Sequence, residues 1–209
     1  MKLMNICLSK SLNIAAILVL FATSAFAAEQ KAVFAGGCFW GVEAVFEHVK
    51  GVIGVRSGYA GGTSETANYD DVSTGRTGHA ESVEVRFDPA KVTYEQLLNV
   101  FFAVAHDPTE VNRQGPDSGT QYRSAIFYVD EKQKSSAEAF IRALDTSKAF
   151  DKAVATEVVP LVAFFAAEEH HQNYLKRNPD DGYIVVNDQP KLKDLKKKFP
   201  GLYRTIPAP

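Results

Sequence analysis

The chain has 209 residues, of which 45% are hydrophobic and 23% charged, and these proportions are ordinary for a globular domain. The formal net charge of −2 argues against a polyanionic partner such as nucleic acid, and no repeat or low-complexity tract stands out. We therefore expect one folded domain, with at most short extensions.

The first 27 residues have the layout of a secretory signal peptide. Lys2 and Lys10 are their only charged residues, and Ala25-Phe26-Ala27 gives the small-x-small pattern of a cleavage site. An apolar run, residues 14–22, lies between Lys10 and this cleavage pattern. The alternative, a membrane anchor, would need roughly 18 apolar residues, and the run is shorter than that. We predict cleavage after Ala27, export, and a periplasmic location for residues 28–209.

Cleavage would remove Cys7 and leave Cys38 as the only cysteine. A single thiol can form neither an internal disulfide nor a multi-cysteine metal site. In an oxidising compartment a lone thiol is a liability unless it is buried or used. Cys38 is therefore the first residue to consider as a functional group.

Hydrophobic periodicity predicts alternating strands and helices along residues 28–209. Strands are expected over residues 31–35, 52–59, 80–87, 122–129 and 155–159. Helices are expected around residues 42–49 with Gly51 as the stop, from the capping box at Thr93 and Gln96 to about residue 105, and over 130–144 and 166–176. Residues 60–78 and 106–120 are polar loops, and the prolines and glycines of the second exclude regular structure there.

The order β-α-β-β-α-β, followed by a further helix and a further strand, predicts an α+β fold. We expect a ferredoxin-like split β-α-β two-layer sandwich with additional helices and a basic, irregular C-terminal tail. Long polar loops in a compact domain are often functional, so the loops over residues 60–78 and 106–120 are candidate parts of a site.

Cys38 follows Gly36-Gly37 at the junction of a predicted strand and a predicted helix. The first turn of a helix offers free backbone N–H groups and the positive end of the dipole, and both lower the pKa of a thiol. The two glycines would let a substrate approach the backbone closely. A buried structural cysteine is an equally open interpretation of this position alone.

Three residues could surround this thiol. Phe39 and Trp40 are adjacent and cannot both face one core stripe of a helix, so one ring could line a pocket for a small apolar group; ordinary core packing is the alternative. Glu81 shares the parity of Val83 and Val85, which directs its carboxyl toward the core, raises its pKa and makes it a candidate proton donor. A bulge at the strand end would instead expose Glu81.

The polar loops contain further candidates. The hydroxyls of Tyr69 and Tyr122 could donate hydrogen bonds to a polarised oxygen, and Asp117 lies close before Tyr122. Taken singly, each of the three is typical of an ordinary loop residue. The histidines lack the H-E-x-x-H spacing, so no metal site is predicted, and His171 is expected to be a structural hydrogen-bonding residue on a helix.

Four blocks, in order and at matching spacing, resemble the A-type peptide methionine sulfoxide reductases over about residues 31–186. The blocks are Gly36 to Glu43 with its G-C-F-W signature, Tyr69 to Glu81, His106 to Thr109 with Asn112 to Ser124, and Glu168 to Leu175, in which His170 stands where tyrosine is usual.

The resemblance implies that residues 28–209 form one catalytic domain that reduces the S epimer of methionine sulfoxide, free or in proteins, and so repairs oxidised exported proteins. It implies these roles: Cys38 as nucleophile, Glu81 as acid, Tyr69 and Tyr122 as ligands of the sulfoxide oxygen, Phe39 and Trp40 as walls around the methyl group, and Asp117 as a supporting polar residue. Attack by Cys38 would release methionine and leave a sulfenic acid on Cys38.

The resemblance implies no metal and no bound cofactor, and we expect a monomer. Many relatives carry resolving cysteines near the C-terminus, but none follows Cys38 here. We hypothesise that an external thiol attacks the sulfenic acid directly; its source would be a thioredoxin-like protein, a glutaredoxin system or a small thiol. A dimer linked through two Cys38 residues as the obligatory intermediate would contradict this hypothesis.

Three other functions remain to be distinguished. A one-cysteine peroxidase would consume peroxide without sulfoxide turnover. A Cys-His acyl-transfer enzyme, with His79 or His171 as base, would cleave esters or amides. A non-catalytic module would bind sulfoxide peptides without converting them.

Overall fold

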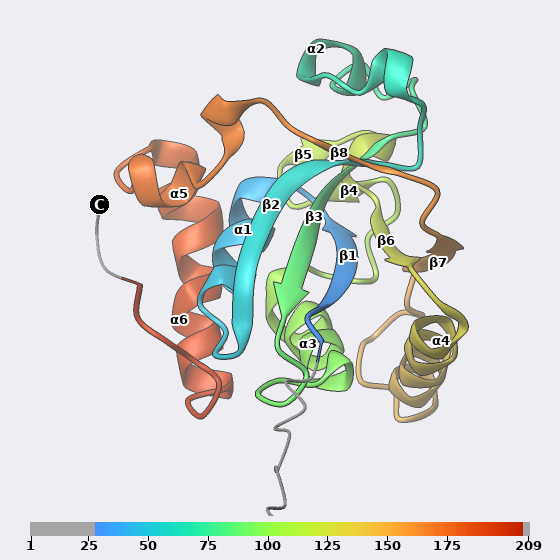
Figure 1. The fold of residues 1–209 in the computed structure, drawn as a ribbon, viewed down its shortest axis with the longest axis vertical. Helices are drawn as coiled ribbons and strands as arrows, with labels where there is room; N and C mark the ends of the chain where they lie inside the picture. Colours follow the sequence, from blue (N-terminus) through green and yellow to red (C-terminus); the bar gives the residue numbers. More distant parts are fainter. Residues whose placement is uncertain (1–27, 207–209) are drawn as a thin grey trace, which may run out of the picture.

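The computed structural model describes residues 28–206, so the predicted signal peptide lies outside the described residues. Its main feature is a six-stranded sheet with the strand order β7-β6-β1-β3-β2-β8 (Figure 1). All neighbouring strands are antiparallel except β6 and β7, which are parallel. The strands are β1 (Gln30–Gly36), β2 (Val52–Ala60), β3 (Ala80–Phe87), β6 (Ser124–Tyr128), β7 (Glu157–Pro160) and β8 (Phe164–Ala166).

Helices pack around this sheet. The α-helices are α1 (Phe39–Glu47), α2 (Tyr69–Val72), α3 (Tyr94–Val100), α4 (Glu131–Thr146), α5 (Tyr174–Arg177) and α6 (Gln189–Lys198). Helix α1 contacts β2 and β3, α6 packs on α1, and α4 contacts α3, β6 and β7 (Figure 1). The expectation of a fold that combines a sheet with helices packed against it is therefore confirmed.

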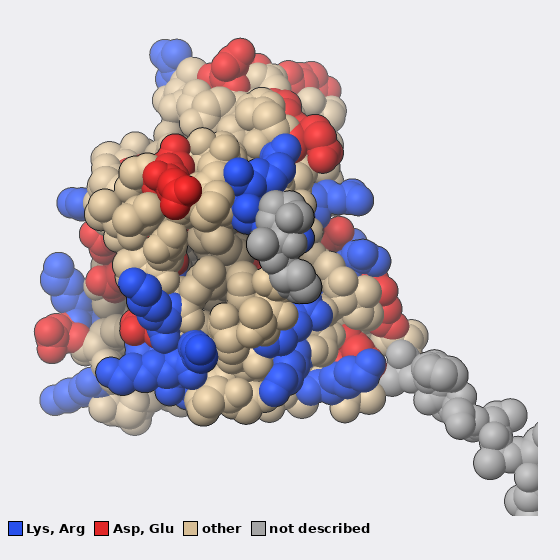
Figure 2. All heavy atoms as spheres, turned by 90° about the vertical axis from the view of Figure 1, so that its left-hand side faces the viewer, with Lys and Arg blue, Asp and Glu red and all other residues tan. Residues whose placement is uncertain are grey.

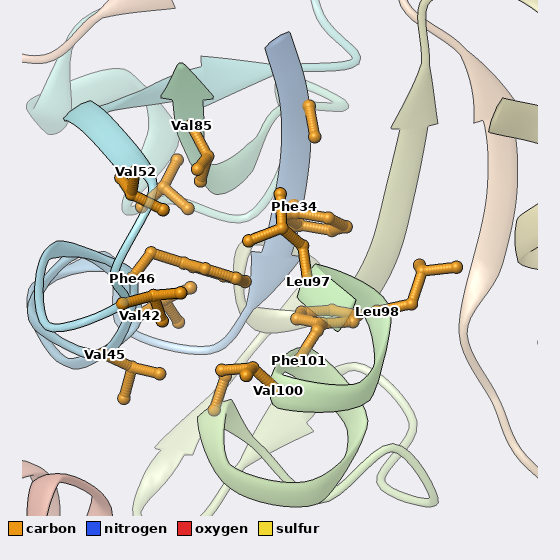
Figure 3. Packing of buried hydrophobic residues seen from close by; sticks show 14 of the residues in the cluster. Phe34, Val42, Val45, Phe46, Val52, Val85, Leu97, Leu98, Val100 and Phe101 are labelled. Atoms are coloured by element: carbon orange, nitrogen blue, oxygen red, sulfur yellow. The ribbon is translucent and has the colours of Figure 1, made fainter. Parts of the chain in front are cut away.

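An aromatic stack joins α1 and α3 to the sheet. The Phe34 ring, at the centre of β1, lies 5.0 Å from the Phe46 ring of α1 and 4.9 Å from the Phe101 ring at the end of α3 (Figure 3). The opposite face of β1 carries the smaller side chains of Val33 and Ala35. The alternation of side chains along β1 thus directs its one aromatic residue to the face on which α1 and α3 lie.

Local signals in the sequence account for several element boundaries. β3 has the predicted bounds 80–87. The capping box is present: the Thr93 hydroxyl accepts from the Gln96 N–H, while the Gln96 side chain accepts from the Thr93 N–H. Asn68 caps α2 and Asp130 caps α4 in the same way, each accepting an N–H three residues further on.

The predicted helix over residues 166–176 is wrong. The chain instead pairs as β8, makes one 3-10 turn over Glu169–His171, bends at Asn173 in the left-handed conformation, and enters the short α5. The cause is tertiary: the Gln172 side chain binds the backbone of Ser57 in β2, which replaces the hydrogen bonds of a continuous helix.

The predicted irregular C-terminal tail is also wrong. A π-helical turn, Ile184–Asp188, leads into α6, whose Leu195 is fully buried against the core. The five lysines of α6 lie around this apolar side, and lysine and arginine side chains gather low on the face that α6 occupies (Figure 2). The basic composition of this segment suggested an irregular tail, but the segment forms an amphipathic helix.

The loops contain more structure than predicted. Residues 60–78 include the 3-10 turn Ser64–Thr66 and α2, and residues 106–120 include a two-stranded hairpin of β4 (Arg113–Gln114) and β5 (Asp117–Ser118). The sharp turns needed here use Gly115 and Gly119 at positive φ. Among the described residues no helix is long and apolar enough to span a membrane.

We predict that Phe34→Ala lowers the free energy of unfolding by about 3–5 kcal/mol, because it leaves a cavity between α1, α3 and the sheet. Urea denaturation followed by circular dichroism measures the change. Val162→Ala is the control, since Val162 is 92% exposed and its truncation should be nearly neutral. An effect at Phe34 no larger than that at Val162 would contradict the central role of this stack.

Candidate active site

The connection from β1 to α1 is a glycine turn. Gly37 has φ +87°, and a Cβ added there would lie 2.5 Å from the Gln114 side chain. Cys38 follows as the N-cap of α1 and is 9% exposed. It therefore lies just before the first helical turn in which we had predicted it.

The first two N–H groups of α1 are directed at acidic groups. The Phe39 N–H donates to Glu81 Oε2 over 3.0 Å. The Trp40 N–H bonds to the Cys38 thiol and lowers its pKa. A helix begins with backbone N–H groups that have no partner inside the helix. Here these donors bring the thiol and a carboxyl from β3 to the same helix end.

The prediction of a low pKa for Cys38 is wrong. Burial raises the pKa of the Cys38 thiol well above its ordinary value, and the charges of Glu81 and Asp188 raise it further. The Trp40 N–H and the Lys191 ammonium oppose these effects but do not outweigh them. Desolvation of the thiolate thus exceeds the stabilisation from the helix end.

Glu81 lies as its strand parity predicted. Its side chain is buried, 3% exposed, on the α1 face of β3. Burial raises the pKa of Glu81 to about 8, with Asp117 adding to the rise and the Phe39 N–H opposing it. At neutral pH this carboxyl is therefore mostly protonated, as a proton donor must be.

The loop residues predicted from the sequence converge on the same place. Burial raises the pKa of Tyr69 and that of Tyr122, and the charges of Glu81, Asp117 and Cys38 raise both further. This shared influence puts both hydroxyls among those acidic groups. Asp117 accepts a hydrogen bond from Tyr183. Five candidates from four separate segments thus form one cluster.

The two aromatic neighbours of Cys38 have different surroundings. Phe39 is fully buried and packs against Tyr59 and His171. Trp40 is half-buried: its ring stacks on Tyr174 at 3.7 Å with 9° between the planes, and Tyr183 meets it edge-on at 6.0 Å. Phe39 is therefore a ring of the core, and Trp40 is the more exposed ring of the two.

The sequence did not single out Tyr174 or Tyr183 as site residues. Tyr174 belongs to the fourth block of the resemblance, which was a usable signal, whereas nothing local marked Tyr183. The C-terminal segment also brings Asp188 and Lys191, which form a 3.0 Å ion pair against Gly41 of α1. Asp188 is 1% exposed and its Oδ2 has no hydrogen-bond partner.

The histidines have structural partners. Trp40 Nε1 donates to His171 Nδ1 over 3.2 Å, and burial lowers the pKa of His171, so that its ring stays neutral and can accept. His79 uses one ring nitrogen on the Gly62 N–H and the other on the Thr63 carbonyl. The hydrogen-bonding role of His171 is confirmed, although it lies in a 3-10 turn. No three His, Cys, Asp or Glu residues within residues 28–206 gather as a metal site.

Comparison with known proteins gives one consistent result. The family model described as "Peptide methionine sulfoxide reductase" matches residues 30–202. Peptide methionine sulfoxide reductase MsrA 2 of Synechocystis is 56% identical over 81% of this chain and 79% of its own length. MsrA 2 of Mesorhizobium japonicum is 54% identical over 86% of this chain and 92% of its own.

Solved structures agree. Reduced Mxr1 of Saccharomyces cerevisiae has a TM-score of 0.68 and 32% identity over 73% of this chain and 87% of its own. Methionine sulfoxide reductase A of Corynebacterium diphtheriae has a TM-score of 0.64 and 36% identity over 72% of this chain and 76% of its own.

These matches define an oxidoreductase. The chain belongs to the peptide methionine sulfoxide reductase family, and its reaction is the reduction of methionine sulfoxide.

We predict that Asp188→Asn lowers the pKa of Cys38, because it removes a negative charge beside the thiol and frees Lys191 from its ion pair. Alkylation by iodoacetamide of the chain from Ala28, followed against pH, should be faster at pH 8 by about three- to tenfold. Asp194→Asn, on the exposed side of α6, is the matched control. Unchanged or slower alkylation of the Asp188 variant would contradict this electrostatic account.

Proposed function

We propose that the protein reduces the S epimer of methionine sulfoxide, free or in oxidised proteins, through a sulfenic acid on Cys38. The observation that carries the proposal is the shared helix end: the Cys38 thiol and the protonated Glu81 carboxyl both meet the first N–H groups of α1. A nucleophile and a proton donor held together are what a sulfoxide needs, because its oxygen is a poor leaving group until protonated.

The reaction would proceed in balanced steps. The Cys38 sulfur attacks the sulfoxide sulfur while Glu81 protonates the sulfoxide oxygen, and the thiol proton passes to the carboxylate that Glu81 has become. Tyr69 and Tyr122 donate hydrogen bonds to the sulfoxide oxygen. The oxygen passes to Cys38, which becomes Cys–SOH, and methionine leaves. The thiol therefore stays protonated at rest and reacts only when a bound sulfoxide receives the Glu81 proton.

The aromatic residues support a substrate with a small apolar group on sulfur. Phe39 forms a buried wall, and Trp40, stacked on Tyr174, presents a rigid ring beside the thiol. Methyl and sulfur both pack favourably against aromatic rings. Asp117 would act through Tyr183, whose hydroxyl it holds beside the Trp40 ring.

We further propose that an external thiol restores Cys38, since no other cysteine follows it. A thiol R–SH would form Cys38–S–S–R with loss of water, and a second thiol would release Cys38–SH and a disulfide. A thioredoxin-type protein is our first candidate, because yeast Mxr1 has been solved in complex with Trx2; a glutaredoxin system or a small thiol is the alternative. Monomeric turnover is expected.

We also propose export to the periplasm and a role in repair of exported proteins. The support is the layout of residues 1–27. Cell fractionation with N-terminal sequencing should place a chain that begins at Ala28 in the periplasmic fraction. Recovery of the uncleaved chain with the cytoplasm would contradict this.

Finally, we propose that the core is a ferredoxin-like split β-α-β. The four central strands run in the order β6-β1-β3-β2, all antiparallel, with α1 between β1 and β2 and α3 between β3 and β6. This order supports the assignment, and β7, β8 and α6 would be additions to it.

We predict that the chain from Ala28, given a dithiol and a racemic methionine sulfoxide peptide, consumes only the S epimer and that Cys38→Ser consumes neither. Chromatographic separation of the epimers measures both outcomes. A folded protein that binds the peptide without consuming it would favour a binding module, and peroxide consumption without sulfoxide turnover would favour a peroxidase.

We predict that Glu81→Gln slows methionine formation in a single turnover by about 10²- to 10³-fold. Because the pKa of Glu81 is about 8, the acid form is present below that pH, and the wild-type rate should decline as pH rises through it. Glu84→Gln, on the same strand but facing Lys31, is the control. A Glu81→Gln profile that keeps the same decline would exclude Glu81 as its source.

A further inference from the structure

A further buried carboxyl, that of Glu43 on α1, lies outside the cluster around Cys38. Glu43 is 1% exposed, and its Oε2 accepts the backbone N–H of Asn173 over 2.9 Å. Its Oε1 has no hydrogen-bond partner. Carboxyl groups are seldom buried so completely without a strong reason, because burial costs free energy that an apolar residue would not lose.

Asn173 adopts an uncommon backbone conformation. Its φ of 54° is in the left-handed region, which most residues other than glycine avoid and which asparagine enters only occasionally. Such a bend persists when its surroundings hold it in place. Glu43 holds it from the side of α1. The neighbouring Gln172 holds it from β2, where its side chain accepts the Ser57 N–H and donates to the Ser57 carbonyl, and it also donates to the Ala167 carbonyl just after β8.

The bend determines how two rings meet Trp40. His171, just before it, accepts the Trp40 Nε1–H over 3.2 Å, and Tyr174, just after it, stacks on the indole at 3.7 Å. A helix continuing through residues 171–174 would give these side chains helical spacing instead. The left-handed residue between them turns the chain so that both can engage one indole.

Glu43 performs this task without a charge at neutral pH. Burial raises the pKa of Glu43 to about 8, and Glu47 adds to the rise, while the hydrogen bond from the Asn173 N–H opposes it. A neutral acid presents a carbonyl oxygen to the Asn173 N–H, which a glutamine amide can also do. Glutamine is therefore a near-isosteric test of the hydrogen bond.

We propose that Glu43 is a positioning residue for substrate binding: through the Asn173 N–H it fixes the bend that clamps the Trp40 ring between His171 and Tyr174. The proposal rests on the proposed function, in which Trp40 is a wall of the methyl pocket. Loss of Glu43 should loosen this wall without touching the thiol or Glu81.

The protein contains a direct reporter, since Trp40 is its only tryptophan. In the chain from Ala28, Glu43→Ala should shift Trp40 emission to longer wavelength and raise KM for a methionine sulfoxide peptide about tenfold, with kcat within about twofold. Glu43→Gln should restore both the emission and KM. Glu138→Ala, at a glutamate of α4 whose side chain is 41% exposed, is the control and should leave both unchanged.

A second pair of variants tests the bend should Glu43→Ala fail to fold. Asn173 is exposed, and Asn173→Ala and Asn173→Gly both remove its side chain, but only glycine tolerates the left-handed conformation. Asn173→Ala should therefore shift the emission and raise KM several-fold, because the strain of a left-handed alanine favours release of the bend. Asn173→Gly carries no such strain and should change neither.

The outcomes separate this inference from the proposed function. A wild-type protein that consumes no sulfoxide would overturn the proposed function, while the fluorescence of the variants would still test the clamp. An active wild type with Glu43→Ala unchanged in emission and KM, or with Asn173→Ala equal to Asn173→Gly, would overturn the role of Glu43. A fall in kcat alone would also overturn it.

Discussion

The hydrogen bond from the Phe39 N–H to Glu81 is the contact on which the site depends. It joins the start of α1 to β3, two elements that are far apart in the sequence, and it uses a backbone donor that the helix cannot satisfy itself. Because Cys38 directly precedes Phe39, this bond also fixes the separation between thiol and carboxyl. Both groups are kept protonated by the same burial. Desolvation thus keeps the Cys38 thiol in its less reactive protonated form and keeps the Glu81 carboxyl able to donate a proton.

The aromatic core makes this contact possible. Phe34 of β1 packs against Phe46 and Phe101, which seats α1 and α3 on one face of the sheet. With α1 held against β2 and β3, its N-terminus points at the end of β3 where Glu81 lies. Packing far from the thiol therefore sets its geometry, and this geometry is rigid because the interior is close-packed.

The C-terminal segment completes the site from the other side. Residues 168–191 bring the rings of His171, Tyr174 and Tyr183 to Trp40 and the Asp188–Lys191 ion pair to Gly41. Side chains rather than regular secondary structure hold this segment: Glu168 accepts from the Tyr59 hydroxyl and the Tyr69 N–H, and Gln172 binds β2. One segment without a cysteine thus contributes both packing and charge around the thiol.

Sequence by itself determined the features that local physics controls. The alternation of Val83, Val85 and Phe87 placed Glu81 inside and predicted its raised pKa, and the Thr93–Gln96 capping box fixed the start of α3. The four motif blocks identified Cys38, Glu81, Tyr69, Tyr122 and Asp117, and the structure brings them together.

Only the tertiary structure decided three matters. The pKa of Cys38 depends on how much water reaches it, so the helix end alone predicted the wrong direction. The break of the helix at Asn173 depends on partners in α1 and β2, more than 100 residues earlier in the chain. The helix α6 is stabilised because Leu195 packs into the hydrophobic core. Each outcome comes from burial and long-range contacts, which a local pattern of residues does not contain.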